Sequence, residues 1–83
     1  MAPSPLSKRF GLAVRARRIV AGLSQEMLAE LAGLHPAYIG MVERGIRNPT
    51  LDVAAHLARS LKVNLQKLIE EAQSQRGSRG RKS

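Results

Sequence analysis

The sequence predicts an all-α fold, a compact bundle of five helices in one domain. Three observations support this prediction. Apolar residues recur at three- and four-residue spacing in five segments, and helix-capping residues stand between these segments. No segment alternates apolar and polar residues as a strand does. A chain of 83 residues also has room for only one hydrophobic core.

A flexible arm is expected over residues 1–7, because this stretch has two prolines and no apolar periodicity. Ser7 is a suitable N-cap for a first helix over about residues 8–21. Phe10 and Val14 are one helical turn apart, so they lie on the same stripe. We expect that stripe to face the core.

Arg18 continues the stripe of Phe10 and Val14, where a charged residue is unusual. Its guanidinium either reaches solvent beyond the core or meets a buried acid. Leu12 and Ile19 project away from this stripe. They are either partly exposed or covered by a neighbouring element.

Two short helices follow, over residues 25–32 and 36–44. Ser24 is a good N-cap for the first, and Gly33 ends it. Pro36 suits the first turn of the second, where no amide donor is needed. The tight joint makes the two helices cross, which predicts a helix-turn-helix. The residues expected to face inward are Leu28, Ala29, Ala32, Ile39 and Val42.

Thr50 and Asn64 are predicted to cap the last two helices. The apolar stripes of these helices comprise Leu51, Ala54, Leu57, Ala58 and Leu61 in the first and Leu65, Leu68 and Ile69 in the second. Residues 73–83 are Gly, Ser, Gln and basic residues that cannot bury apolar area, so a disordered basic tail is expected there. The ordered domain is therefore expected over residues 8–72.

The formal net charge of +8 favours an anionic partner, most often nucleic acid and sometimes a membrane surface, although solubility alone also accounts for it. There is no cysteine, and His35 and His56 are far apart, so we expect no metal site and no cofactor. No apolar run is long enough for a signal peptide or a membrane span. A cytoplasmic protein is expected, or a nuclear one if the source is eukaryotic.

The positive charge is unevenly distributed. Residues 1–50 hold seven basic and three acidic residues, whereas residues 51–75 hold three of each. The remaining tail adds four basic residues. The positive charge therefore lies on the first three helices and on the tail. The basic residues of the tail either contact phosphates or only keep the chain end solvated. The neutral half suits a scaffold or a self-association face.

The outward face of the helix over residues 36–44 is small and free of acids. Ala37, Met41 and Arg44 lie opposite Ile39, and Tyr38 flanks them. A helix with such a face fits a major groove about 12 Å wide. The alternative is an ordinary surface helix, although those usually carry Lys and Glu.

The spacing of five residues resembles the lambda repressor and Cro-like family of helix-turn-helix proteins, also called the XRE family. These residues are Gln25, Ala29, Gly33, Ile39 and Val42. The flanking pieces GLSQ, ERG-x-RNPTL and LARSLKVNLQKL also match. The pieces Tyr38-Ile39-Gly40 and Glu43-Arg44-Gly45 look most like small stand-alone regulators, including restriction-modification controller proteins.

The resemblance implies a lambda-repressor-like five-helix bundle that dimerises on a palindromic operator, with its third helix in the major groove. It implies base readout by His35, Pro36, Ala37, Tyr38 and Met41, and phosphate contacts by Gln25, Arg44, Arg47 and Asn48. It also pairs Arg18 with Glu43 in a partly buried ion pair. Relatives often place hydrogen-bonding side chains where this chain has Pro36 and Ala37, so readout there would rest on thymine methyl groups.

The sequence thus favours a sequence-specific double-stranded DNA-binding transcriptional regulator, acting as a homodimer. The alternative is an antitoxin-like protein-interaction module with an enzyme partner and secondary operator binding. An enzyme is not expected, because no nucleophile–base set, phosphate loop or metal cluster is visible.

Overall fold

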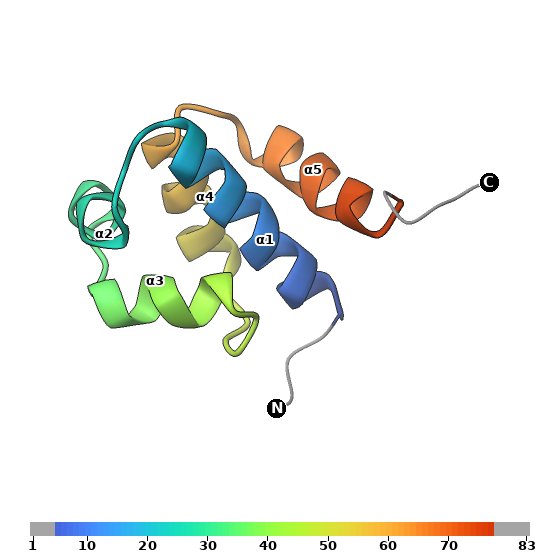
Figure 1. Ribbon diagram of the computed structural model, residues 1–83, viewed down its shortest axis with the longest axis horizontal. Helices are drawn as coiled ribbons and strands as arrows, with labels where there is room; N and C mark the ends of the chain where they lie inside the picture. The colour runs from blue at the N-terminus through green and yellow to red at the C-terminus, as the bar shows by residue number, and fades with distance from the viewer. Residues whose placement is uncertain (1–4, 78–83) are drawn as a thin grey trace.

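A computed structural model describes residues 5–77 of the chain, which form five helices and no strand. The helices are α1 (Pro5–Val20), α2 (Gln25–Ala32), α3 (Pro36–Glu43), α4 (Leu51–Ser60) and α5 (Leu65–Gly77). The predicted all-α bundle is therefore confirmed. Figure 1 shows α1 through the middle of the molecule, with α5 along one side and α3 crossing near its other side.

The expected limits of the first and last helices were wrong. α1 begins at Pro5, not residue 8, because a proline at the first helical position needs no amide partner. Ser7, expected as the N-cap, is instead buried within the first turn. α5 continues to Gly77, whereas a disordered tail was expected from residue 73. The other parts of the expected arm and tail lie outside the described residues.

The later helices begin where their capping residues predict. Ser24 Oγ accepts from the Met27 amide at 3.0 Å, Thr50 Oγ1 from Val53 at 3.1 Å, and Asn64 Oδ1 from Lys67 at 2.7 Å. Each bond satisfies an amide of the first helical turn that has no partner within the helix. These local bonds set the starts of α2, α4 and α5.

The core lies where all five helices meet. Its largest fully buried side chains are Val14, Leu28, Ile39, Val42, Leu57 and Leu68. Leu51 was expected in the core stripe of α4 but is 80% exposed, because it is the first residue after the cap and points outward. Leu12 and Ile19 are 48% and 52% exposed, which settles the choice left open for them.

α1 and α3 lie in direct contact at Gly11. A Cβ atom on Gly11 would lie 2.1 Å from the Val42 carbonyl oxygen and 2.8 Å from that of Glu43. No side chain fits in this space, so Gly11 allows the backbone of α3 to rest directly on α1. This contact determines how far α3 stands from the centre of the bundle.

Candidate nucleic-acid interface

The α2–α3 crossing has the geometry of a helix-turn-helix. Gly33 has φ 70° and ψ 34°, a left-handed conformation that favours glycine, and the Leu34 amide donates to the Ala29 carbonyl at 2.8 Å. Ala29 is buried at the crossing, and Ile39 and Val42 of α3 are fully buried against the domain. The inward residues predicted for this pair of helices are therefore confirmed.

The opposite side of α3 faces solvent. His35, Pro36 and Ala37 are exposed at its N-terminal end, and Met41 is half-buried one turn further on. Tyr38 is also half-buried and packs against the core, so only part of its ring is accessible. The five residues expected to read bases thus lie on or beside one accessible surface. That surface includes no carboxylate.

His35 caps α3, although histidine is not a preferred N-cap. Its Nδ1 atom accepts from the Ala37 amide at 3.3 Å. A neutral ring that accepts through Nδ1 carries its proton on Nε2. The cap therefore leaves Nε2–H as the hydrogen-bond donor that His35 presents beyond the helix end.

The Arg18–Glu43 ion pair that the resemblance implied is present in the structure. Arg18 Nε donates to Glu43 Oε2 at 2.6 Å, and its Nη2 donates to Oε1 at 3.1 Å. The exposed fractions of the two side chains are 12% and 3%. Hydrogen bonding to Glu43 raises the pKa of Arg18 above its ordinary value. A third bond, from Nη1 to the Leu23 carbonyl at 2.8 Å, ties the pair to the segment before α2.

Gln25, the first residue of α2, joins this network. Its Nε2 atom donates to Glu43 Oε1 at 3.0 Å, and its side chain is half-buried. A carboxylate can only accept, so this bond orients the amide with its nitrogen toward Glu43. The amide group expected to touch a phosphate is thus held by α3 before any ligand binds.

The predicted phosphate-contacting residues after Gln25 lie at the end of α3 and in the loop that follows. Arg44 is the C-cap of α3, and Arg44, Arg47 and Asn48 are all exposed. The side-chain oxygen of Asn48 accepts from the Ser7 hydroxyl, which fastens the loop to α1. Tyr38, Ile46, Arg47 and Asn48 line a hollow of about 450 Å³ beside α3.

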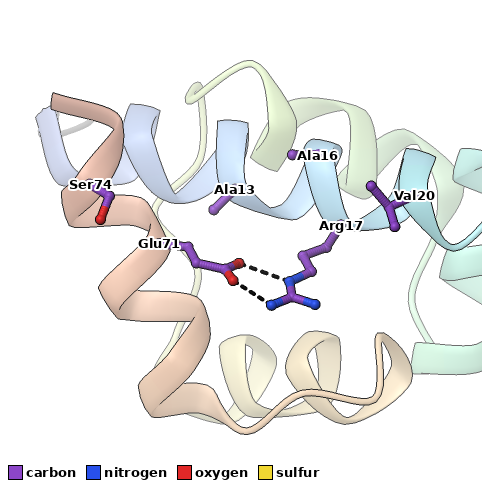
Figure 2. A pocket seen from close by; sticks show the side chains of 6 residues that line it. All are labelled: Ala13, Ala16, Arg17, Val20, Glu71 and Ser74. Carbon is purple, nitrogen blue, oxygen red and sulfur yellow. Dashed lines mark hydrogen bonds and ion pairs between the residues drawn. The ribbon is translucent and has the colours of Figure 1, made fainter. Parts of the chain in front are cut away.

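A second hollow lies on the other side of α1, against α5. Ala13, Ala16, Arg17, Val20, Glu71 and Ser74 line its volume of about 350 Å³. Figure 2 shows Arg17 of α1 reaching Glu71 of α5, and Arg17 Nε donates to Glu71 Oε1 at 2.8 Å. This pair was not predicted from the sequence. It fastens α5 to α1 away from the helix-turn-helix.

Two further kinds of feature are absent from the described part of the chain. Residues 5–77 contain no group of three side chains that could hold a metal ion. None of the helices described is long and apolar enough to cross a membrane. The feature that combines exposure, positive charge and preorganised donors is the surface of α3 with Gln25.

Comparison with known proteins is consistent with this surface. The helix-turn-helix family HTH_3 matches residues 14–68. Control protein C.SmaI of Serratia marcescens is 50% identical over 56 residues, which cover 68% of this chain and 67% of that protein. An uncharacterized HTH-type transcriptional regulator of Mycobacterium tuberculosis is 37% identical over 62 residues, 75% of this chain but only 44% of that protein.

A solved structure shows the same arrangement of helices. The restriction-modification controller protein C.AhdI from Aeromonas hydrophila superposes with a TM-score of 0.73 at 44% sequence identity. The superposition covers 75% of this chain and 94% of that chain.

Proposed function

The chain belongs to the helix-turn-helix family that matches residues 14–68, and from this we propose that it is a sequence-specific transcriptional regulator that binds double-stranded DNA. It acts as a homodimer on a palindromic operator, with α3 in the major groove of each half-site. Its likeness to C.SmaI and C.AhdI further suggests a controller protein of a restriction-modification system. Such a regulator works in the cytoplasm.

One observation carries this proposal. The outer surface of α3 is exposed and has no acid, and charged or amide donors stand at both of its edges. Gln25 of α2 and the Arg44 guanidinium flank it together over Gly40, and Arg47 flanks it beside Tyr38. A major groove needs this arrangement, in which phosphate contacts on both sides position a helix that reads bases between them.

We assign base readout to the residues at the N-terminal end of α3 and along its outer face. His35 offers its Nε2–H to a base acceptor, and Tyr38 offers a hydroxyl from the edge of the helix. Pro36, Ala37 and Met41 offer only apolar contact, which suits thymine methyl groups. Phosphate contacts are assigned to Gln25, Arg44, Arg47 and Asn48.

The dimer is assigned to the half of the molecule that contains α4 and α5. Residues 51–75 carry no net charge, so two copies meet there without the repulsion that the rest of the chain would cause. Leu51 is 80% exposed on this side and gains most from being covered. Two recognition helices then bind half-sites about 34–36 Å apart.

DNA binding at several salt concentrations tests the proposal. The wild-type chain should select a duplex from random-sequence DNA, and its affinity should fall steeply with salt as phosphate contacts release counterions. Tyr38→Ala combined with Gln25→Ala should lower affinity for the selected duplex. Lys67→Ala on α5 removes a positive charge away from α3, and it serves as the control once sedimentation shows that it dimerises as the wild-type chain does. A DNA affinity that changes neither with salt concentration nor on the double substitution contradicts the proposal.

A second candidate is an antitoxin-like module that binds a partner enzyme. The exposed apolar residues of α1 favour it, because Leu12, Ile19 and Val20 are 48%, 52% and 85% exposed. Co-purification from the native host separates the two candidates. A stoichiometric enzyme partner supports the antitoxin-like module, and a homodimer alone counts against it.

A further inference from the structure

Gly40 is the residue of α3 whose identity the fold leaves unexplained. Glycine within a helix is less stable than alanine, and Gly40 does not have the positive φ that favours glycine elsewhere in this chain. It is nevertheless buried. Its presence therefore needs a spatial reason.

The atoms around Gly40 provide that reason. A Cβ atom at this position would lie 3.3 Å from Arg44 Nη1, and 3.7 and 3.8 Å from Gln25 Oε1 and Nε2. A guanidinium from the end of α3 and an amide from the start of α2 thus converge over the same backbone. The missing Cβ leaves room for the Arg44 guanidinium close to the Gln25 amide.

We propose that Gln25 and Arg44 form one composite phosphate site over Gly40, and that Gly40 and Glu43 are its positioning residues. This inference rests on the proposed function. Glu43 holds one Nε2 hydrogen of Gln25, which leaves the other as a donor. Within residues 5–77 the Arg44 guanidinium pairs with no carboxylate, so its donors are available to an anion.

Arg18 completes the electrostatics of this site. An unpaired carboxylate at Glu43 would repel a phosphate bound by Gln25. The charge of Arg18, at 2.6 Å, neutralises that carboxylate while leaving its hydrogen bond to Gln25 intact. The site therefore presents the net positive charge of Arg44 together with an amide donor held at a fixed orientation.

Gly40→Ala tests the inference on a duplex selected by the wild-type chain. The added methyl group forces the Arg44 guanidinium to shift by a few tenths of an ångström, and affinity should fall about tenfold for each half-site, the scale of one charge-assisted hydrogen bond. The salt slope should decrease by about 0.9 for each phosphate that the protein no longer neutralises. Thermal stability should stay level or rise, because alanine favours a helix more than glycine does. A general folding defect would lower it.

Combined substitutions locate the effect. In a chain that already carries Gln25→Ala and Arg44→Ala, Gly40→Ala should cause no further loss of affinity. Arg47 lies outside the composite site, so in a chain that carries Arg47→Ala the substitution Gly40→Ala should cause its full loss of affinity. Full loss in both backgrounds would overturn the inference, as would wild-type affinity and salt slope in Gly40→Ala alone.

Methylphosphonate substitution of the duplex provides a test without Gly40→Ala. Neutralising one phosphate of each half-site should weaken the wild-type complex, and both Gln25→Ala and Arg44→Ala should abolish sensitivity at that same phosphate. Sensitivity lost at two different phosphates overturns the composite site while the proposed function stands. If the wild-type chain binds no duplex in a salt-dependent manner, the proposed function fails and the inference fails with it.

Discussion

Two neighbouring arginines of α1 have different structural roles. Arg18 reaches α3 and pairs with Glu43, whereas Arg17 reaches α5 and pairs with Glu71. The side chains of the first pair, which we call the inner pair, are 12% and 3% exposed. Those of the second, the outer pair, are 32% and 28% exposed. α1 is thus joined to α3 by a mostly buried ion pair and to α5 by a partly exposed one.

The difference bears on how strongly each contact stabilises the fold. Water screens the outer pair, so its contribution is small and depends on salt. The inner pair also bonds Leu23 and Gln25, and the loss of either charged partner leaves the other without compensation. We infer that α1, α2 and α3 form a fixed frame, whereas α5 is held mainly by apolar packing around Leu68 and Ala72.

The largest expected effect comes from Glu43→Ala, which breaks the inner pair. It leaves Arg18 charged and mostly buried, and should lower the free energy of unfolding by about 3–5 kcal/mol. Chemical denaturation monitored by circular dichroism measures this loss. Replacing both partners, with Arg18→Met and Glu43→Leu, should recover most of it. A loss no larger than that of Glu71→Ala would refute the distinction between the two pairs.

Enlarging a small residue on each side of α1 tests the same distinction through packing. Gly11→Ala puts a methyl group against the backbone of α3 and should cost about 1–3 kcal/mol or more. Ala16→Leu on the other side extends into the hollow of about 350 Å³ beside α5 and should be nearly neutral. Thermal denaturation compares the two variants. Equal losses would show that both sides of α1 are equally tightly packed.

A smaller effect is expected from Glu71→Gln, which removes the charge of the outer pair. Its thermal midpoint should fall only slightly at low salt. The difference from wild type should vanish near 1 M salt, where the screening length is about 3 Å. The loss caused by Glu43→Ala should persist at the same salt concentration, because a buried pair is screened much less. If the stability losses of Glu71→Gln and Glu43→Ala both vanish at high salt, the inner pair is screened as strongly as the outer one.

The smallest effect is a pH dependence of the outer pair. The hydrogen bond from Arg17 lowers the pKa of Glu71 below its ordinary value of 4.5. A carboxyl group whose pKa is lowered by folding stabilises the fold above its unfolded pKa and loses that contribution as the pH falls through the lowered value. The stability difference between wild type and Glu71→Gln should therefore be constant at neutral pH and shrink below about pH 4.5. A difference that grows on acidification contradicts this assignment.

Local signals predicted most of the helices well. Ser24, Gly33 and Thr50 act on amides or dihedral angles within a few residues, so their effect is visible in the sequence. Prediction was poorer at the two ends of the described chain. There α5, which packs against α1, runs on to Gly77, and Ser7 is bonded to Asn48 instead of capping α1. Neither partner is near in sequence.

Only part of the candidate site was predicted, again because some of its contacts join residues that are far apart in sequence. The surface of α3 follows from helical periodicity, and the partner of Arg18 came from the family resemblance. The bond between Gln25 and Glu43 was not predicted, because it depends on how closely α2 and α3 cross. Gly11 and Gly40 were also missed. A glycine in a helical pattern gives no sign of the backbone or side chain that will lie against it.

The sequence by itself determined the five helices, the helix-turn-helix and the positive charge of the first fifty residues, because these depend on local propensity, spacing and composition. Only the tertiary structure decided which acid pairs with Arg17 and which with Arg18. It also decided at which glycines the missing side chain leaves space for a neighbouring group. These depend on distances between helices that are set by packing of the whole core. Adjacent residues of a helix point about 100° apart, so Arg17 and Arg18 meet different neighbours, and the chain order alone does not show which.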